Sequence, residues 1–437
     1  MKKYFISGAM LAGLMSLAAC SNDEGVVADN NGAEQQFTIT LASSGDRATR
    51  AAADRTLESE AAGQSIEKVT LVVRSQDDNK VVYIHTLNNW NDTATDYNTN
   101  GHGKKLTFTI PKADKLGAGS YVVTAVGYNE GNYNLKLPAK GDVVDKNITA
   151  ITPADAEAKE VFAGEQEFTV KDGKIDGTDG SKAIQSVDVT LHRQVAGAYG
   201  YFTSIPAKIG ETDVASIRMV SRSKNTVLTF GSFNRSFTTT DAKVMYMVNG
   251  SVPAGKTAKF LNGDEANVLF SAKITDWFPG GDKNNDGVYD KKDTNWTKHY
   301  SGSYLKGSVF ASNFIVPFSA TQGKSTLELQ LLDATGNVLY AWPVKLDASN
   351  DQIGKTGETA SANLSDPITA MGFAETADVF SLFRNHIYSI GIHKQGTTNP
   401  DKTEPGTDEP TDLSKIQNVV IRVNDNWEAL HHMSIDE

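Results

Sequence analysis

The sequence predicts an all-β chain built from sandwiches of antiparallel sheets. Short runs rich in Val, Ile, Thr, Tyr and Phe recur along the chain, and these residue types favour a pleated, half-buried surface. Helical patterns are scarce, since only residues 152–160 could form a short capped helix. Many strands with few helices are typical of two-layer antiparallel architectures.

The size and charge of the chain limit its possible functions. Its 437 residues are enough for two or three domains with sizeable cores. A net charge of −11 without a basic patch argues against nucleic acid as a partner. No His-Glu-x-x-His or Gly-x-Ser-x-Gly motif occurs, so we expect no enzymatic activity.

The N-terminus has the pattern of an export signal. A basic pair, Lys2-Lys3, precedes an apolar run from Tyr4 to Leu17, and Leu17-Ala18-Ala19-Cys20 has the form of a bacterial lipobox. Residues 1–19 would then be a lipoprotein signal peptide, and the thiol of Cys20 would carry a lipid. The alternative is a chance cysteine beside an ordinary signal-peptide cut.

A single strand is predicted directly after a polar spacer at residues 21–35. Phe37, Ile39 and Leu41 alternate with threonines, which places them on one face of a strand. The strand precedes a small, flexible stretch at residues 43–55. We expect residues 20–50 to form a propeptide that contains this releasable strand.

Three arginines lie in the stretch that follows this strand, where an arginine-specific protease could cleave the chain. Arg50 is the favoured cleavage site because Ala51, Ala52 and Ala53 follow it. Arg47 and Arg55 are alternatives, and the stretch could also be a basic linker that is not cut.

The body of the chain reads as strand after strand. We place a domain boundary near Gly180, after a Gly- and Asp-rich stretch, which gives an N-terminal sandwich at 51–180 and a C-terminal sandwich at 181–394. Residues 333–337 between two runs predict a hairpin turn. The predicted runs lie at 69–73, 81–87, 106–110, 121–128, 168–170, 187–191, 227–230, 244–248, 268–274, 309–318, 327–332 and 338–346.

The end of the chain, residues 395–437, is predicted to be a linker followed by one strand. Prolines, Gly, Thr and Asp dominate the linker. In the strand, Val419, Ile421 and Val423 alternate, and Trp427 follows. Because a single strand cannot bury its own backbone and apolar face, it must pair with its own body or with another molecule.

One loop has the spacing of a calcium site. Oxygen ligands stand at positions 1, 3, 5, 9 and 12, and a backbone carbonyl falls at position 7. The last position holds Asp instead of the bidentate Glu, and the flanks are not amphipathic helices. The loop is therefore either a structural calcium loop or a polar turn. The candidate ligands are Asp282, Asn284, Asp286, Val288, Asp290 and Asp293.

Several stretches in combination resemble the fimbrillins of Bacteroidetes, also called type V pilins. The resemblance covers nearly the whole chain and includes the lipobox, the strand before the arginines and the separate terminal strand. The matching stretches of the body are Ile66 to Val73, Gly119 to Tyr128, Val161 to Gly164, Leu191 to Ala196 and Phe383 to Ile390.

The resemblance implies two β-sandwich domains of transthyretin-like, Greek-key type with a detached C-terminal donor strand. It implies a structural pilin, exported as a lipoprotein precursor held at the outer membrane by its lipid. An arginine-specific protease would release the first strand, and identical or related subunits would polymerise by donor-strand exchange into cell-surface fimbriae that support adhesion. No cofactor is implied, so calcium is the one candidate. The alternative function is a monomeric surface lipoprotein that binds a glycan or a host protein.

Overall fold

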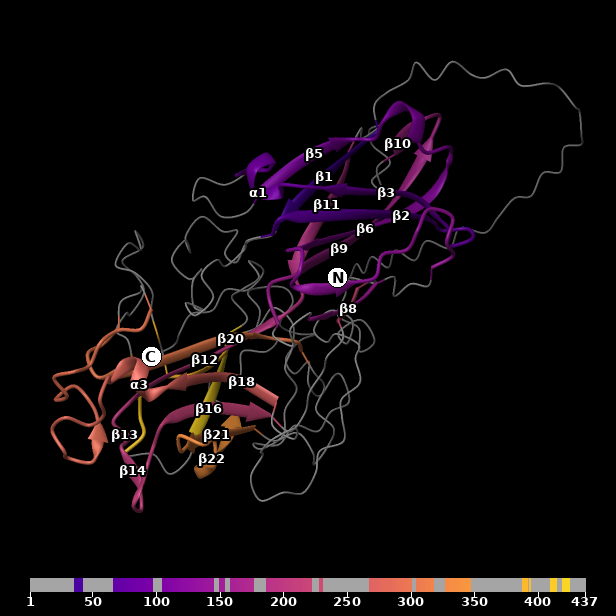
Figure 1. The fold of residues 1–437 in the computed structure, drawn as a ribbon. Coiled ribbons are helices and arrows are strands. Elements are labelled where there is room, and N and C mark those ends of the chain that lie inside the picture. The colour runs from indigo at the N-terminus through magenta and orange to yellow at the C-terminus, as the bar shows by residue number, and fades with distance from the viewer. Residues whose placement is uncertain are drawn as a thin grey trace, which may run out of the picture.

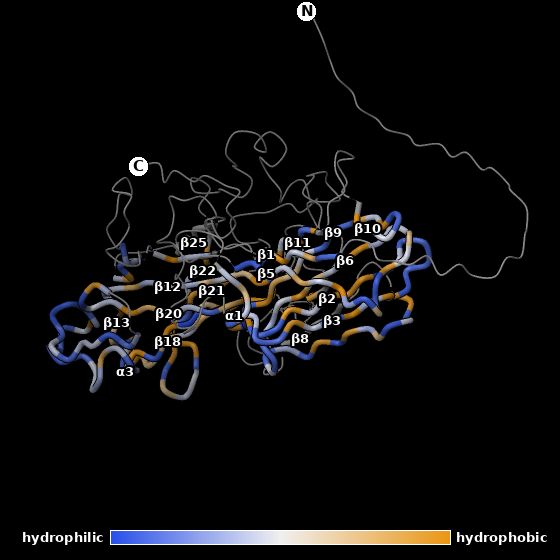
Figure 2. Tube along the Cα trace, turned by 90° about the horizontal axis from the view of Figure 1, so that it is seen from above, coloured by the Kyte–Doolittle hydropathy of each residue, from blue (hydrophilic) through white to orange (hydrophobic). Residues whose placement is uncertain are grey.

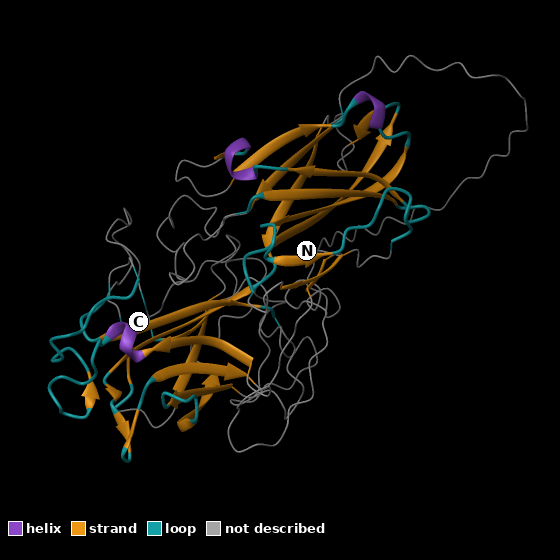
Figure 3. Ribbon diagram, in the orientation of Figure 1, coloured by secondary structure: helices purple, strands orange, loops and turns teal. Residues whose placement is uncertain are grey.

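The computed structural model describes residues 35–41, 66–96, 104–144, 149–153, 158–176, 186–221, 228–230, 267–300, 304–317, 327–346, 387–391, 393, 409–414 and 419–424. Nearly all of its elements are strands, which confirms the predicted all-β fold (Figure 3). Two bodies of strands lie end to end, one from each half of the chain (Figure 1). Among the expected sites, Cys20, Arg47, Arg50, Arg55 and Trp427 lie outside the described residues.

The N-terminal body is a nine-stranded sheet with the order β3-β2-β6-β9-β11-β1-β5-β4, in which β10 also pairs with β9. Two short helical turns lie in the connections between strands: α1 (Trp90–Thr93) joins β3 to β4, and η1 (Lys112–Asp114) joins β5 to β6. The strands are β1 (Gln36–Leu41), β2 (Lys68–Ser75), β3 (Val81–Leu87), β4 (Thr95–Asp96), β5 (Lys104–Thr109), β6 (Gly119–Tyr128), β9 (Phe162–Lys171), β10 (Lys174–Asp176) and β11 (Ser186–Arg193).

Position in the sheet explains the sequence pattern of each strand. β2 lies between β3 and β6, and its interior residues are all buried, so it is mostly apolar apart from the buried Thr70 and Arg74. β5 lies near the end of the sheet order and alternates between half-buried and exposed residues. Figure 2 shows hydrophobic residues along the strands and hydrophilic ones at many of the connecting loops.

The sheet folds into two layers at β9 and β11. These strands pair only through His192↔Ala163 and Arg193↔Phe162, so they diverge beyond that point. At the crossing, a Cβ added to Gly164 would lie 2.0 Å from the Thr190 carbonyl oxygen, and only glycine permits so close an approach. β11, β1, β5 and β4 therefore form a second layer that faces β2, β6 and β9.

The C-terminal body is a second nine-stranded sheet with the order β18-β16-β21-β22-β25-β23-β12-β20, in which β24 also pairs with β12. Its core contains Trp277, from the helical turn α3 (Ile274–Trp277), with Tyr201, Phe202 and Phe310. The strands are β12 (Ala196–Thr203), β16 (Ser216–Ser221), β18 (Asn267–Lys273), β20 (Ser308–Ile315), β21 (Leu327–Leu332), β22 (Val338–Leu346), β23 (Ile387–Ile390), β24 (Thr411–Asp412) and β25 (Val419–Asn424).

Smaller sheets complete the fold. β13 (Ile205–Pro206) pairs with β19 (Val288–Tyr289), and β14 (Lys208–Ile209) pairs with β15 (Thr212–Asp213). A third small sheet joins β7 (Tyr133–Leu135), β8 (Thr149–Pro153) and β17 (Leu228–Phe230), so it links segments from both halves of the chain.

Two local expectations differ from the structure, and one is confirmed. The helix expected over 152–160 is wrong at its start, because residues 149–153 form strand β8 between β7 and β17, and tertiary pairing overrides the local signal. The boundary placed near Gly180 precedes β11, which belongs to the first sheet, so the change of sheet falls between Arg193 and Ala196. The hairpin at residues 333–337 does connect the antiparallel strands β21 and β22.

Candidate functional site

Strand β1 is an interior strand of the N-terminal body. It pairs in parallel with β11, from Gln36↔Ser186 to Leu41↔Leu191. On its other side it pairs antiparallel with β5, from Gln36↔Thr109 to Leu41↔Lys104. Its backbone therefore fills the space between two strands that do not pair with each other.

The apolar face of β1 enters the core as its alternation predicts. The side chains of Phe37 and Ile39 are fully buried. The Phe37 ring meets the Phe168 ring of β9 edge to face, with centroids 5.4 Å apart, so the contact crosses the sandwich. Burying two such side chains contributes roughly 1.5–3 kcal/mol each. The side chain of Leu41 lies outside the described residues.

The other face of β1 is tied to both neighbouring strands by hydroxyl groups. The Thr38 hydroxyl oxygen lies 3.1 Å from that of Thr107 on β5 and 2.6 Å from that of Ser186 on β11. Thr38 is 4 % exposed, and both of these hydrogen bonds are partly buried. This cross-strand contact fixes the side-chain register of β1 against both partners.

Gln35, directly before β1, is a functional candidate that the sequence reading missed. Its buried amide donates to the Leu116 carbonyl and accepts from the Leu116 amide, each at 2.9 Å. The same amide nitrogen donates to the Gly173 carbonyl at 3.2 Å, and the Gln35 carbonyl accepts from the Ile110 amide at 2.9 Å. A glutamine at the end of a polar spacer gives no local signal of such burial.

β5 has a second support besides β1. The Phe108 ring of β5 stacks on the His85 ring of β3, with centroids 4.1 Å apart. Burial lowers the pKa of His85, which disfavours its charged form, while nearby Asp114 opposes that shift. Tyr83 of β3 also stacks with Phe108, and burial raises the pKa of Tyr83 to about 12. The two layers therefore meet at β3 and β5 through aromatic rings.

The C-terminal strand β25 lies in the sheet of its own body. It pairs in parallel with β22, from Val419↔Val344 to Ile421↔Leu346, and antiparallel with β23, from Ser389↔Arg422 to Ile387↔Asn424. The expectation of a detached strand is thus not met in this single chain, because β22 and β23 offer edges within reach. β24 leads toward it, and the Leu413 amide donates to the Thr203 carbonyl at 3.0 Å.

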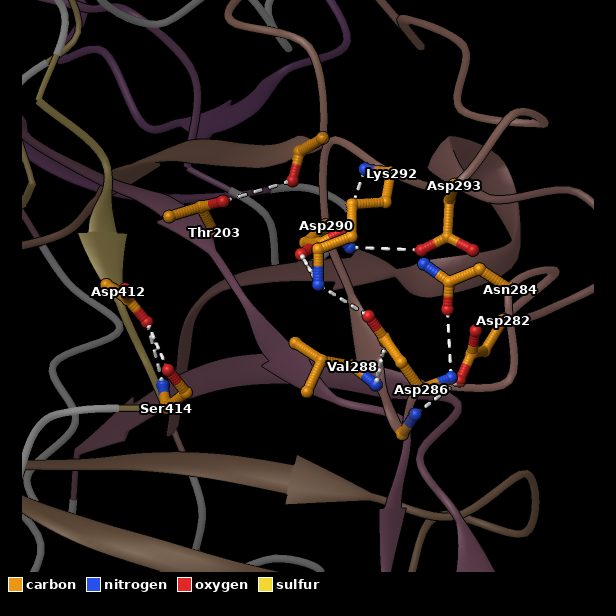
Figure 4. Close-up of polar contacts among 12 residues, drawn as sticks. Thr203, Asp282, Asn284, Asp286, Val288, Asp290, Lys292, Asp293, Asp412 and Ser414 are labelled. Atoms are coloured by element: carbon orange, nitrogen blue, oxygen red, sulfur yellow. Dashed lines mark hydrogen bonds and ion pairs between the residues drawn. The ribbon is translucent and has the colours of Figure 1, made fainter.

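The candidate calcium loop is closed by hydrogen bonds of its own (Figure 4). Asp282 accepts from the Asn285 and Gly287 amides, both at 2.8 Å. Asp293 is fully buried and accepts from the Lys283 amide at 2.8 Å and the Asp290 amide at 3.0 Å. Each of these two carboxylates therefore accepts two backbone N–H hydrogen bonds from the loop.

A lysine supplies positive charge inside this loop. The Lys292 ammonium lies 2.8 Å from a carboxylate oxygen of Asp286 and 3.5 Å from one of Asp290. Its hydrogen bond lowers the pKa of Asp286. Within the described residues, no three His, Cys, Asp or Glu side chains are grouped so that they could hold a metal ion. The loop carboxylates are thus held by backbone amides and by Lys292, and the calcium ligand set stays a prediction.

Among the described residues, no helix has the length and hydropathy that a membrane-spanning segment needs.

Comparison with known proteins finds no matching family model and no matching curated protein.

Solved structures similar to this chain include several fimbrial proteins. A fimbrial assembly protein from Parabacteroides distasonis is 12% identical, with 82% of this chain and 92% of that chain covered and a TM-score of 0.34. The fimbrial anchor protein Mfa2 from Porphyromonas gingivalis is 12% identical, with 91% and 100% covered and a TM-score of 0.32. The tip fimbrial protein Mfa3 from Porphyromonas gingivalis, with C-terminal truncation, is 10% identical, with 90% and 99% covered and a TM-score of 0.33.

Proposed function

We propose that this chain is a structural subunit of cell-surface fimbriae that supports adhesion and polymerises by donor-strand exchange after proteolysis. The observation that carries the proposal is the position of β1. It is an interior strand of a folded body, yet the next described residue is Ile66, and the intervening stretch contains Arg47, Arg50 and Arg55. A cut in that stretch would leave β1 held without a covalent bond to the rest of the body.

Departure of β1 would create a site for another strand. β5 and β11 would each present a row of unpaired N–H and C=O groups, and the core positions of Phe37 and Ile39 would be empty. Neighbouring strands lie about 4.8 Å apart, so a gap of two spacings accepts one strand. An incoming strand with alternating apolar residues would restore both the pairing and the burial by β-augmentation.

The end of the same chain has a strand of this kind. Val419, Ile421 and Val423 repeat the spacing of Phe37, Ile39 and Leu41. β25 would leave its place between β22 and β23 and insert into the vacated position of the next subunit. Such head-to-tail insertion is a heterologous contact, and it extends into a filament when the rotation between subunits does not close a ring.

In this proposal the N-terminus targets the precursor to the outer membrane. Lipid on Cys20 would hold the precursor at the outer membrane until an arginine-specific protease acts, with Arg50 as the favoured cut. Cleavage would remove the anchor together with β1. The mature subunit would then be attached to the cell only through its neighbours in the filament.

One observation is compatible with the alternative of a monomeric surface lipoprotein that binds a glycan or a host protein. β25 pairs within its own body, as a monomer requires. An unprocessed pilin precursor is compatible with the same arrangement, because β1 fills the acceptor position until cleavage and β25 has no neighbouring subunit to enter. The response of the chain to proteolytic cleavage therefore distinguishes a pilin from a monomeric surface lipoprotein.

The test is cleavage of the purified precursor by an arginine-specific protease, followed by a gel without boiling. We expect a ladder of oligomers, and we expect no ladder when Arg47, Arg50 and Arg55 are all replaced by alanine. Deletion of residues 412–437 should abolish the ladder as well. Complete cleavage that leaves only monomers would refute the proposed assembly.

A mixing control shows whether the truncated chain is folded. A cleaved chain without residues 412–437 keeps its acceptor position, so it should form a dimer with a full-length donor. If this dimer does not form while the wild-type chain still gives a ladder, the deletion disrupts the fold. The variants Val419→Asp and Ile421→Asp would then be used in place of the deletion.

A further inference from the structure

We propose that Gln417 sets the register of the inserted C-terminal strand by taking the place that Gln35 holds before β1. The inference rests on the proposed strand exchange and adds to it a recognition residue and a defined alignment. It places Gln417 against Leu116 of the next subunit, Val419 in the position of Phe37, and Ile421 in the position of Ile39.

The buried polar contacts of Gln35 are the first support. Its side-chain amide both donates to and accepts from the backbone of Leu116, and it also donates to Gly173. When Gln35 leaves with β1, the Leu116 amide and carbonyl lose these partners inside the protein. Because an unpaired buried backbone group is costly, the incoming chain needs a side chain that both donates and accepts at that point.

A similar residue pattern occurs near the C-terminal end of the chain. Gln35-Gln36-Phe37-Thr38-Ile39 has its counterpart in Gln417-Asn418-Val419-Val420-Ile421. The shared features are a glutamine, a second carboxamide residue, and apolar residues at the third and fifth positions. Leu41 and Val423 continue the match at the seventh position.

The pairing of β25 is an independent support. β1 has a parallel neighbour on one side, β11, and an antiparallel neighbour on the other, β5. β25 likewise has a parallel neighbour, β22, and an antiparallel neighbour, β23. β25 therefore already occupies a position of the same polarity as the one that β1 would vacate.

Alignments of the inserted strand that are shifted by two residues lose the same contacts. A slip of two residues one way brings Val419 to the position of Gln35, where its side chain can neither donate to nor accept from Leu116. A slip of two the other way brings Gln417 to the position of Phe37, which is fully buried among apolar residues. The alignment of Gln417 with Gln35 avoids both penalties.

Disulfide trapping tests the register directly. Thr38 and Thr107 face each other with hydroxyl oxygens 3.1 Å apart, so Val420 of the inserted strand should face Thr107. The chain has one native cysteine, and Cys20→Ala removes it. A Val420→Cys donor is then mixed during cleavage with an acceptor that carries Thr107→Cys, Lys105→Cys or Thr109→Cys.

We expect an intersubunit disulfide with Thr107→Cys and at least tenfold less with the other two acceptors. A dominant disulfide at position 105 or 109 in an assembled ladder would overturn the register while leaving strand exchange intact. Absence of assembly in all mixtures, including the parent without added cysteines, would refute strand exchange and the register together.

A second measurement tests Gln417 itself. Gln417→Ala should dissociate from the next subunit roughly tenfold faster, which corresponds to the loss of one to two net hydrogen bonds. Asn418→Ala is the matched control, because its counterpart Gln36 does not take part in the Leu116 contacts, and it should dissociate at the wild-type rate. Equal dissociation rates for Gln417→Ala and wild type would overturn the role of Gln417.

Discussion

Arg193 and Glu160 form a buried ion pair where the chain passes from the first sheet to the second. A guanidinium nitrogen of Arg193 lies 2.7 Å from a carboxylate oxygen of Glu160, and both side chains are only 4% exposed. The guanidinium carbon also lies 5.1 Å from the centre of the Phe162 ring, within the range of a cation–π contact. The pair joins the end of β11 to the segment that enters β9.

Removal of one partner of this pair should destabilise the fold more than removal of both. Arg193→Met should lower the free energy of unfolding by about 3–5 kcal/mol, because it removes the positive charge that lies beside the buried Glu160 carboxylate. The double variant Arg193→Met/Glu160→Leu should recover much of this loss. Urea unfolding of the precursor measures both values.

An exposed ion pair serves as the control for this prediction. Lys208 and Asp213 lie 3.2 Å apart with side chains 54% and 77% exposed. Lys208→Met should change the free energy of unfolding by less than about 1 kcal/mol. A loss for Arg193→Met as small as the loss for Lys208→Met would contradict the argument.

Gln35→Leu should loosen β1 in the precursor. The substitution leaves the Leu116 amide and carbonyl without their partners, at about 1–3 kcal/mol for each unpaired group. Hydrogen exchange of the β1 amides should therefore be faster in Gln35→Leu than in the wild type. Unchanged exchange in Gln35→Leu would show that Gln35 does not hold the strand.

Local patterns were sufficient for some parts of this fold and not for others. The alternation of Phe37 and Ile39 correctly predicted a strand with an apolar face in the core, because side-chain direction in a strand depends only on sequence period. The place of β11 could not be predicted, since it depends on parallel pairing with a strand about 150 residues away. The burial of Gln35 and the return of β25 to its own sheet depend on the same kind of distant pairing.

The stack of His85 on Phe108 should make the N-terminal body sensitive to mild acid. Burial lowers the pKa of His85 below 6.5, so the unfolded chain takes up a proton first as pH falls. The His85 contribution is complete above pH 6.5 and decreases as pH falls from there toward the folded-state pKa. His85→Phe keeps a ring against Phe108 and should remove this part of the pH dependence. Identical slopes of unfolding free energy between pH 7.5 and 5 in both proteins would contradict it.

The loop at residues 282–293 should be stable without a metal ion. Its carboxylates are held by backbone amides and by Lys292, so calcium would have to displace the ammonium group from Asp286. We expect the melting temperature to be the same with 1 mM calcium as with a chelator. Asp293→Ala should lower it in both conditions, because two backbone amides lose their buried acceptor. A calcium-dependent rise in melting temperature that disappears in Asp286→Ala would instead restore the calcium interpretation of this loop.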